Sequence, residues 1–435
     1  MSLPGMVAAQ PRVPCFLADT WWFGLTSRLP EERFAELARL RAAQGFSAVQ
    51  IVVGIPPEVG PGNLNAWSSQ GPAWFLDGRP NTGYLDHARR RIELLNAAGL
   101  TAVVYGCWGH QLAWLGVAGA KTWWARLVDR LDDLDVIYCV SGETNLWIGA
   151  EDALLPDRTT GDLRLQAARA RLPGRLKTML RPLRARFVRH RRAAAAHARR
   201  AGWDEVLAGL AASTDRPLLA HVIPGESSAD ALDRADLLAA VTVQTGHDED
   251  SRRLLWEWPA RLARRFHGRP FINLEPWYEG IHGDFGRDDQ LFAYWVSMLA
   301  GAAAYCYGAQ GIWNVGDGAF LAHWGAQSLD TAVASPTPAL LGASHRALLH
   351  HGFPDPGGVT TVDAVGGALR SITRVRADGT GAVSFYPDMS RIRDVSLARV
   401  PARQASGSAG DRYFAPDQGK FVAQPPSQGP MVLLT

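Results

Sequence analysis

Short apolar runs alternate with amphipathic runs over the first three quarters of the chain. The short runs have the length of buried strands, whereas the longer runs between them have the period of helices that bury one face. Regular alternation of strands and helices predicts an α/β fold with a parallel sheet. The predicted strands span residues 14–20, 46–54, 100–108, 136–142, 217–223, 240–245, 270–275 and 303–308. Eight such units predict a (β/α)8 TIM barrel, whose active site lies at the carboxyl ends of its strands.

Start and stop signals support the predicted helices. Pro30 begins the first helix, and Glu31 and Glu32 in its first turn complement the helix dipole. Gly45 ends this helix and Gly99 ends the next one, because glycine adopts the left-handed conformation of a helix end without strain. These signals mark the boundaries between the first three strands and their helices.

The pattern changes near residues 353–358, a stretch rich in proline and glycine. Short alternating segments follow, and turn signals such as Asp378-Gly379 separate them. The segments with the strongest strand pattern are residues 369–375, 381–386 and 431–434. This part of the chain predicts a small all-β sandwich. The two expected domains are a barrel over residues 1–353 and a β-sandwich over residues 354–435.

Composition places the chain among ordinary folded proteins. Of its 435 residues, 47% are hydrophobic and 20% are charged, and no apolar run is long enough for a transmembrane helix. The first ten residues lack a basic start and contain Pro4 and Gly5, which makes a poor secretory signal, so we expect a cytoplasmic protein. Four cysteines lie singly in apolar runs and are expected to be buried free thiols: Cys15, Cys107, Cys139 and Cys306.

The net charge of +3 hides a strongly basic stretch. Residues 158–200 contain fourteen Arg and Lys against one acid, within an expected insertion at about 155–200. Such blocks usually form a solvated face, and we expect a basic surface helix here. Nucleic-acid binding is not expected, because no recognition motif or interleaved aromatic residue accompanies the charge. A docking surface for an acidic partner or an anionic glycan is the alternative.

Side chains suited to sugar binding collect at the predicted strand ends. Glu143 and Glu275 end the fourth and seventh strands, and two such acids are what glycoside hydrolysis requires. Indole faces stack on sugar rings, and most tryptophans of the chain fall at these ends or in the following loops. The side chains expected to contact a carbohydrate substrate are Asp19, Trp21, Trp22, Gln50, Trp108, His110, Asn145, His221, Gln244, His247, Trp277, Tyr278 and Trp313.

Seven motifs resemble, in order, those of the apiosidase-like glycoside hydrolases. They are ADTWW (18–22), GFSAVQ (45–50), YGCWG (105–109), CVSGE (139–143), VQTGH (243–247), FINLEPWYEG (271–280) and YGAQGIW (307–313). The resemblance covers about residues 14–350, and the tail is similar to the collagen-binding-like β-domain that often follows this barrel. It implies that Glu143 is the general acid/base, that Glu275 is the nucleophile, and that hydrolysis retains the anomeric configuration.

The expected chemistry needs no metal or other cofactor, because carboxylates stabilise the positive charge of the oxocarbenium-like transition state. Tyr278, His247 or His221 could donate hydrogen bonds to Glu275 and keep it ionised. Glu279, in the loop after the seventh strand, is expected to be solvated.

Two alternatives remain. A metal-dependent hydrolase would place a His-x-His pair at the end of the first strand, where this chain has Asp19-Thr-Trp21. A catalytically inactive carbohydrate-binding barrel would keep the pocket without needing both Glu143 and Glu275. The sequence leaves the sugar, the linkage and the oligomeric state open.

Overall fold

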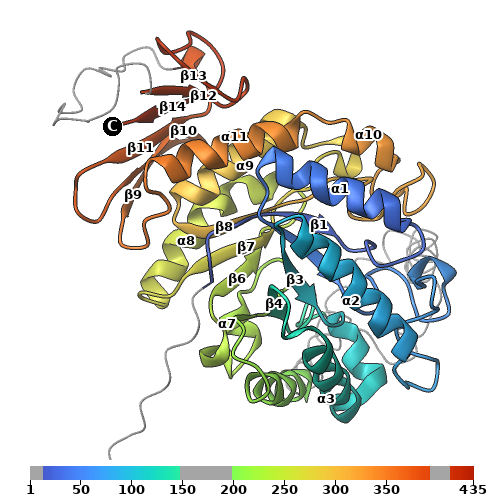
Figure 1. Cartoon of the computed structure of the whole chain (residues 1–435). Helices are drawn as coiled ribbons and strands as arrows, with labels where there is room; N and C mark the ends of the chain where they lie inside the picture. Colours follow the sequence, from blue (N-terminus) through green and yellow to red (C-terminus); the bar gives the residue numbers. More distant parts are fainter. Residues whose placement is uncertain (1–12, 147–197, 392–411) are drawn as a thin grey trace, which may run out of the picture.

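A computed structural model of the chain describes residues 13–146, 198–391 and 412–435, and its largest part is a barrel of eight strands (Figure 1). These strands form one parallel sheet in the order β5-β4-β3-β2-β1-β8-β7-β6. They are β1 (Leu17–Trp21), β2 (Ala48–Val52), β3 (Thr101–Tyr105), β4 (Val136–Cys139), β5 (Leu218–Leu219), β6 (Val241–Gln244), β7 (Phe271–Glu275) and β8 (Ala302–Tyr307). Each of these strands overlaps in sequence with one of the predicted strands, so the predicted (β/α)8 barrel is confirmed.

Single hydrogen bonds connect the two ends of this sheet. The Ala239 N–H donates to the Leu218 carbonyl at 2.8 Å, and the Thr242 hydroxyl donates to the Ala220 carbonyl. The barrel is therefore closed between β5 and β6, although no ladder joins these two strands.

Helices cover the outside of the barrel (Figure 1). The first ends as predicted, because Gly45 has a φ of 98° and its N–H donates to the Ala42 carbonyl. The main α-helices in the described ranges are α1 (Glu31–Gln44), α2 (Thr82–Ala97), α3 (Leu112–Leu131), α7 (Ser228–Ala231), α8 (Leu254–Arg265), α9 (Arg287–Leu299), α10 (Leu329–Val333) and α11 (Thr337–His350). Short 3-10 turns are η1 (Leu64–Ala66), η2 (Gly109–Gln111), η3 (Ala235–Leu237), η4 (Glu249–Arg253), η5 (Ile281–Gly283) and η6 (Met389–Arg391). Residues 198–211 add a further helical stretch.

Side chains of β1 alternate between the helix layer and the barrel interior. Trp21 packs edge to face against Phe34 of α1, with ring centroids 5.3 Å apart. Thr20 faces the other way, and its hydroxyl accepts from the Gln50 amide of β2. Both faces of this strand are buried, so the hydrophobic pattern alone does not show which face a residue takes.

The C-terminal residues form a second sheet, antiparallel and six-stranded. Its order is β13-β12-β14-β11-β10-β9, with bounds β9 (Val359–Val365), β10 (Ala368–Val375), β11 (Ala382–Tyr386), β12 (Tyr413–Ala415), β13 (Lys420–Val422) and β14 (Met431–Leu434). Trp295 of α9 stacks on Phe385 at 6.3 Å between centroids. The predicted all-β domain is confirmed. Its described strands make a single sheet, and helix α9 of the barrel supplies the layer that faces it.

Strand β9 was not predicted, because its residues are mostly exposed and do not alternate between apolar and polar. The expected strands at 369–375, 381–386 and 431–434 correspond to β10, β11 and β14. Between the domains, α11 ends at His350 and β9 begins at Val359, on either side of the expected boundary.

Several expectations fall on residues outside the described ranges. The basic insertion lies mostly within residues 147–197, and the N-terminal segment that suggested a cytoplasmic protein lies within residues 1–12. Among the described helices, none combines the length and apolarity needed to cross a membrane. The cysteines are free thiols; Cys107, Cys139 and Cys306 are buried, and Cys15 is half-buried.

Candidate active site

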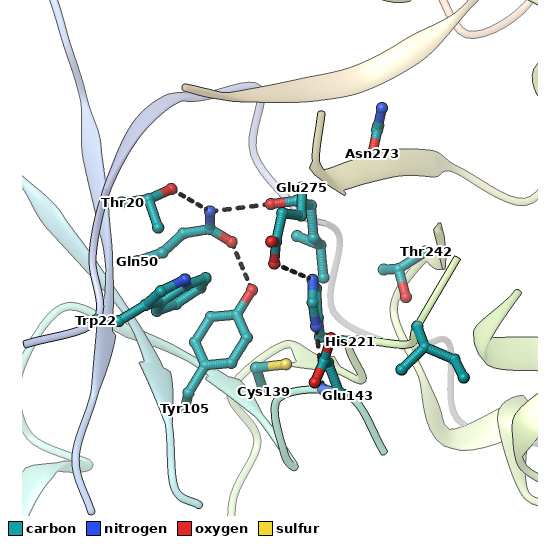
Figure 2. Close-up of polar contacts among 12 residues, drawn as sticks. Thr20, Trp22, Gln50, Tyr105, Cys139, Glu143, His221, Thr242, Asn273 and Glu275 are labelled. Atoms are coloured by element: carbon teal, nitrogen blue, oxygen red, sulfur yellow. Dashed lines mark hydrogen bonds and ion pairs between the residues drawn. The ribbon is translucent and has the colours of Figure 1, made fainter. Parts of the chain in front are cut away.

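A β-bulge in β7 sets the direction of Glu275. Val243 of β6 pairs with Asn273, but the next residue, Gln244, pairs with Glu275, so Leu274 is an extra residue in β7. A bulge of this kind interrupts strict alternation and re-aims the side chain that follows it. Asn273 donates to the Thr245 hydroxyl at 3.0 Å, whereas Glu275 points to the other side, towards His221 (Figure 2).

Two histidines hold the Glu275 carboxylate. His247 Nε2 lies 2.8 Å from Oε1, and His221 Nε2 lies 3.0 Å from Oε2 in a more bent contact. Burial opposes ionisation of this carboxyl, but hydrogen bonds and charge interactions with the two imidazoles lower the pKa of Glu275 from 4.5 to about 2. Glu275 is therefore a carboxylate at neutral pH. The expectation that His247 donates to it is confirmed, and His221 makes a close contact with the second oxygen.

His221 also contacts the other predicted catalytic residue. Its Nδ1 accepts the backbone N–H of Glu143 at 3.0 Å. An accepting Nδ1 carries no proton, so the proton of the neutral ring is on Nε2, the atom that faces Glu275. One imidazole thus lies between the main chain of Glu143 and the carboxylate of Glu275 (Figure 2).

The backbone of Glu143 has an unusual conformation, with a φ of 45°. Non-glycine residues adopt such angles rarely, and mainly where surrounding structure enforces them. Gly109 packs directly against this peptide, since a Cβ at Gly109 would lie 2.0 Å from the Glu143 carbonyl oxygen. The indole Nε1 of Trp108 donates to the Glu143 side chain, 2.9 Å from Oε2. The side chain of Glu143 is therefore directed by its own backbone and by Trp108.

Aromatic rings surround the two carboxylates. Trp22 makes edge-to-face contacts with Tyr105 and Trp108, at 4.7 Å and 5.4 Å between centroids, and its Nε1 donates to the Tyr278 hydroxyl at 2.9 Å. Tyr278 lies 4.8 Å from the His247 ring and 6.2 Å from Trp313. Burial and the neighbouring Glu275 charge raise the pKa of Tyr278 well above its usual value, so its hydroxyl stays protonated.

Four other predicted contacts lie around this centre. His110 is buried in η2 after β3, and Gln244 is buried at the end of β6. Asn145 follows Glu143 by two residues and is half-buried; its amide donates to Glu226 at 2.7 Å and accepts from the Ile223 N–H at 2.8 Å. Trp313 donates to the Gln310 side chain at 2.9 Å. Asn145 thus links the loops that follow β4 and β5.

Asp19 and Trp21 were expected in the substrate site and lie outside it. Asp19 is fully buried against α1, where its Oδ2 is 2.6 Å from Arg41 Nε and 2.8 Å from the Trp21 indole nitrogen. Both residues lie on the outer face of β1, because side chains of a strand alternate between faces. This carboxylate neutralises a buried arginine and stabilises the barrel wall.

Trp277 and Gln50 also require correction as substrate contacts. Trp277 is fully buried beside α9, stacks on Phe285 at 4.8 Å and donates to the Ser251 hydroxyl at 2.5 Å. The next residue, Tyr278, points towards the site instead, where it contacts Trp22 and His247. Gln50 is fully buried in the barrel interior, and its amide is hydrogen-bonded to the protein at both ends.

The sequence pattern missed Tyr105 and misjudged Glu279. Tyr105 ends β3 and contacts Trp22, Trp108 and the His221 ring, at 4.7, 6.3 and 5.8 Å between centroids. Its position at a strand end within the YGCWG motif was the available signal. Glu279 is half-buried and accepts hydrogen bonds from the hydroxyls of Tyr307, Ser335 and Thr337, so it is a structural carboxylate rather than a solvated one.

Within the described ranges, no group of three or more His, Cys, Asp and Glu side chains is arranged to hold a metal ion. Of the imidazole nitrogens nearest Glu275, His247 Nε2 is hydrogen-bonded to the carboxylate and His221 Nε2 lies 3.0 Å from its other oxygen. The chemistry that this arrangement supports with its own groups is that of an ionised carboxylate, Glu275, and a second carboxyl, Glu143, at the ends of two barrel strands that His221 connects.

Comparison with known proteins agrees with this arrangement. The sequence profile of a family described as "Apiosidase-like, catalytic domain" matches residues 9–334. Comparison with curated protein sequences gave no match.

Solved structures share the fold of the whole chain. A protein described as a glycoside hydrolase superposes with a TM-score of 0.66 at 16% identity, over 97% of this chain and 92% of its own. A glycoside hydrolase family 5 protein from Bacteroides vulgatus gives a TM-score of 0.65 at 16% identity, over 97% and 89% of the two chains. The profile match spans most of the sequence, and the chain therefore belongs to the apiosidase-like family of glycoside hydrolases.

Proposed function

We propose that the chain hydrolyses a glycosidic bond with retention of anomeric configuration, with Glu275 as nucleophile and Glu143 as general acid/base. The observation that carries this proposal is the state of Glu275. Its two carboxylate oxygens face two imidazole N–H groups, and its pKa is lowered to about 2 in spite of burial. A carboxylate nucleophile must stay ionised at the working pH, and the two imidazoles keep Glu275 ionised.

In the first step, the Glu143 carboxyl donates its proton to the glycosidic oxygen while an oxygen of Glu275 attacks the anomeric carbon. The bond between the anomeric carbon and the glycosidic oxygen breaks, and the leaving group departs as an alcohol. The sugar is then joined to Glu275 as an ester, and Glu143 is left as a carboxylate.

In the second step, the Glu143 carboxylate takes a proton from water, and the water oxygen attacks the anomeric carbon. The ester bond to Glu275 breaks and regenerates its carboxylate. Two displacements at one carbon restore the original configuration. The Trp108 indole, 2.9 Å from Glu143 Oε2, holds the acid/base in one orientation during both steps.

The aromatic wall supports a carbohydrate as substrate. Trp108, Tyr278 and Trp313 offer flat apolar faces beside polar groups, a combination that suits the C–H faces and hydroxyls of a sugar ring. Asn145, two residues after Glu143, and Gln244, which pairs with Glu275, provide further polar side chains close to the two carboxylates. The sugar itself is to be identified by testing pentosides as well as hexosides.

A screen of aryl glycosides with three matched variants tests the proposal. Wild type should release the aryl group from at least one glycoside, and Glu143→Gln and Glu275→Gln should each lose that turnover. Glu279→Gln is the control, because it makes the same chemical change four residues from Glu275 in a carboxylate whose partners are structural hydroxyls. It should keep turnover.

Two outcomes would replace the proposal. Binding of glycosides without release of the aryl group would favour a carbohydrate-binding barrel. Turnover that survives in both Gln variants, in protein containing stoichiometric zinc, would favour a metal-dependent hydrolase.

A further inference from the structure

The bulge that aims Glu275 leaves a main-chain group in the barrel interior that must be hydrogen-bonded. Leu274 is the extra residue of the bulge, and its carbonyl points towards β2. A buried carbonyl without a partner is costly, and irregular backbone is where ladder bonds are interrupted. The Nε2 of Gln50 donates to this carbonyl at 3.0 Å (Figure 2).

The Gln50 amide is itself held in one orientation. The Tyr105 hydroxyl donates to its Oε1 at 2.5 Å, and its Nε2 also donates to the Thr20 hydroxyl at 2.9 Å. That hydroxyl in turn donates to the Tyr307 carbonyl at 2.8 Å. The Gln50 Oε1 accepts a hydrogen bond and both N–H groups of its Nε2 donate one. The side-chain amide therefore cannot flip by 180° without losing hydrogen bonds.

These contacts connect the bulge to the strands on the opposite wall. Gln50 belongs to β2, Thr20 to β1 and Tyr105 to β3, whereas the bulge belongs to β7. Gln50 is fully buried, so no substrate reaches it directly. A buried amide costs free energy unless its hydrogen bonds are made, and an apolar residue of the same size would fill the space without that cost.

We propose that Gln50 is a positioning residue, which holds the β7 bulge and thereby directs Glu275 onto His221 and His247. This role acts through the Leu274 carbonyl and not through contact with substrate. Its kinetic consequence rests on the proposed function of Glu275, but its structural consequence does not.

The test compares Gln50→Met with Gln290→Met. Gln290 is the matched control, because it is also fully buried and its Nε2 also donates to two main-chain atoms, the carbonyls of Trp277 and Phe285. Both substitutions remove a buried amide and keep its approximate volume. Crystal structures of both variants give the position of Glu275, and an aryl glycoside turned over by wild type gives kcat and KM.

In Gln50→Met, we expect the bulge to shift and at least one Glu275–histidine contact to exceed about 3.5 Å, the limit for a hydrogen bond. A displacement of about 1 Å should lower kcat about 100-fold with little change in KM. Gln290→Met should keep both histidine contacts and a kcat close to that of wild type. An intact bulge with both contacts in Gln50→Met, or an equal loss of kcat in both variants, would overturn the proposal.

Gln50→Glu adds a second, pH-dependent test. A protonated carboxyl can donate to the Leu274 carbonyl, but a carboxylate cannot. We therefore expect the activity of this variant, relative to wild type, to fall as pH rises, whereas a purely structural role predicts a constant ratio. If both Gln50 variants fail to fold while Gln290→Met folds, the residue supports the barrel as a whole and the positioning role is wrong.

The structural arm separates failure of this proposal from failure of the proposed function. If wild type hydrolyses no glycoside, the proposed function fails, but the position of Glu275 in the Gln50→Met crystal still decides whether Gln50 holds the bulge.

Discussion

Asp19 and Glu275 are both buried carboxylates on barrel strands, and they differ in the partners that balance their charge. Asp19 lies 2.6 Å from Arg41, and neither side chain is exposed. Glu275 is held by two histidines, and its side chain is 8% exposed to solvent. An arginine is always charged and cancels the carboxylate, whereas an imidazole N–H can stabilise the negative charge by donating a hydrogen bond. The pair of Asp19 and Arg41 stabilises the packing of α1 on the barrel. The histidines leave Glu275 with a negative charge that can take part in a reaction.

The comparison shows that the face of the strand decides which role a carboxylate takes. Asp19 lies on the outer face of β1 and meets the helix layer. Glu275 lies beyond a bulge that directs it into the mouth. Residue type and position at a strand end do not distinguish Asp19 from Glu275. Their hydrogen-bond partners and the face of the strand on which they lie do distinguish them.

The largest expected effect is loss of turnover in Glu275→Gln. Removing the nucleophile should lower kcat by at least about 10⁴-fold, because the covalent intermediate can no longer form. The variant should still fold, since the substitution keeps the volume, but its free energy of unfolding should be lower than that of wild type, because the charge that the two histidines stabilise is removed. A variant that folds and retains more than a tenth of the wild-type rate would contradict the contrast between the two carboxylates.

Asp19→Asn should lose stability but keep turnover. Breaking a buried ion pair leaves Arg41 charged without its partner, which should lower the free energy of unfolding by about 3–5 kcal/mol. The kcat of the folded variant should be close to wild type, because Asp19 faces away from the site. Chemical denaturation and kinetics on the same sample measure both quantities. A large fall in kcat with unchanged stability would place Asp19 among the catalytic groups.

The pH dependence of His247→Leu sharpens the role of the histidines. His247 and His221 lower the pKa of Glu275 to about 2 against the opposing effect of burial. Removing one donor leaves burial less opposed, so the pKa of Glu275 rises and the acidic limb of the rate profile moves to higher pH. His345→Leu is the control, because His345 is buried outside the site and its ring contacts the Tyr294 hydroxyl. An acidic limb that stays in place in His247→Leu would show that this histidine does not set the charge of Glu275.

The same shift links Glu275 to stability. Its pKa is lower in the folded chain than its ordinary value of 4.5, so its contribution is complete above pH 4.5 and is lost as the pH falls towards about 2. In denaturation experiments, the His247→Leu variant should therefore show a smaller loss of stability than wild type across this window. An equal loss in both proteins would show that another acidic group dominates.

Trp108→Phe should have the smallest effect of the series. It removes the N–H that contacts Glu143 Oε2, and a hydrogen bond to a charged group contributes about 1.5–3 kcal/mol, which corresponds to a loss in kcat of about 10–150-fold. Trp124→Phe is the control, because its N–H donates to the Val140 carbonyl and not to a side chain of the site. Equal kinetic losses in the two variants would show that Trp108 acts only through packing.

The barrel and the two catalytic candidates could be predicted because periodicity and strand ends carry a strong signal. The faces of the strands could not, because β1 is buried on both sides and Asp19 and Thr20 look equally suitable in the sequence. The bulge at Leu274 leaves no composition signal, although it separates the directions of Asn273 and Glu275. Gln50 was predicted to bind substrate because a polar residue in a strand suggests a site, and only its partners show that it bonds the protein instead.

The stereochemistry of hydrolysis tests the central claim most directly. Proton NMR of the first sugar released by the wild-type protein from an aryl glycoside distinguishes the two anomers before they equilibrate. Double displacement through Glu275 predicts that the first-formed sugar has the anomeric configuration of the substrate. A first-formed sugar of inverted configuration would contradict the assignment of Glu275 as nucleophile.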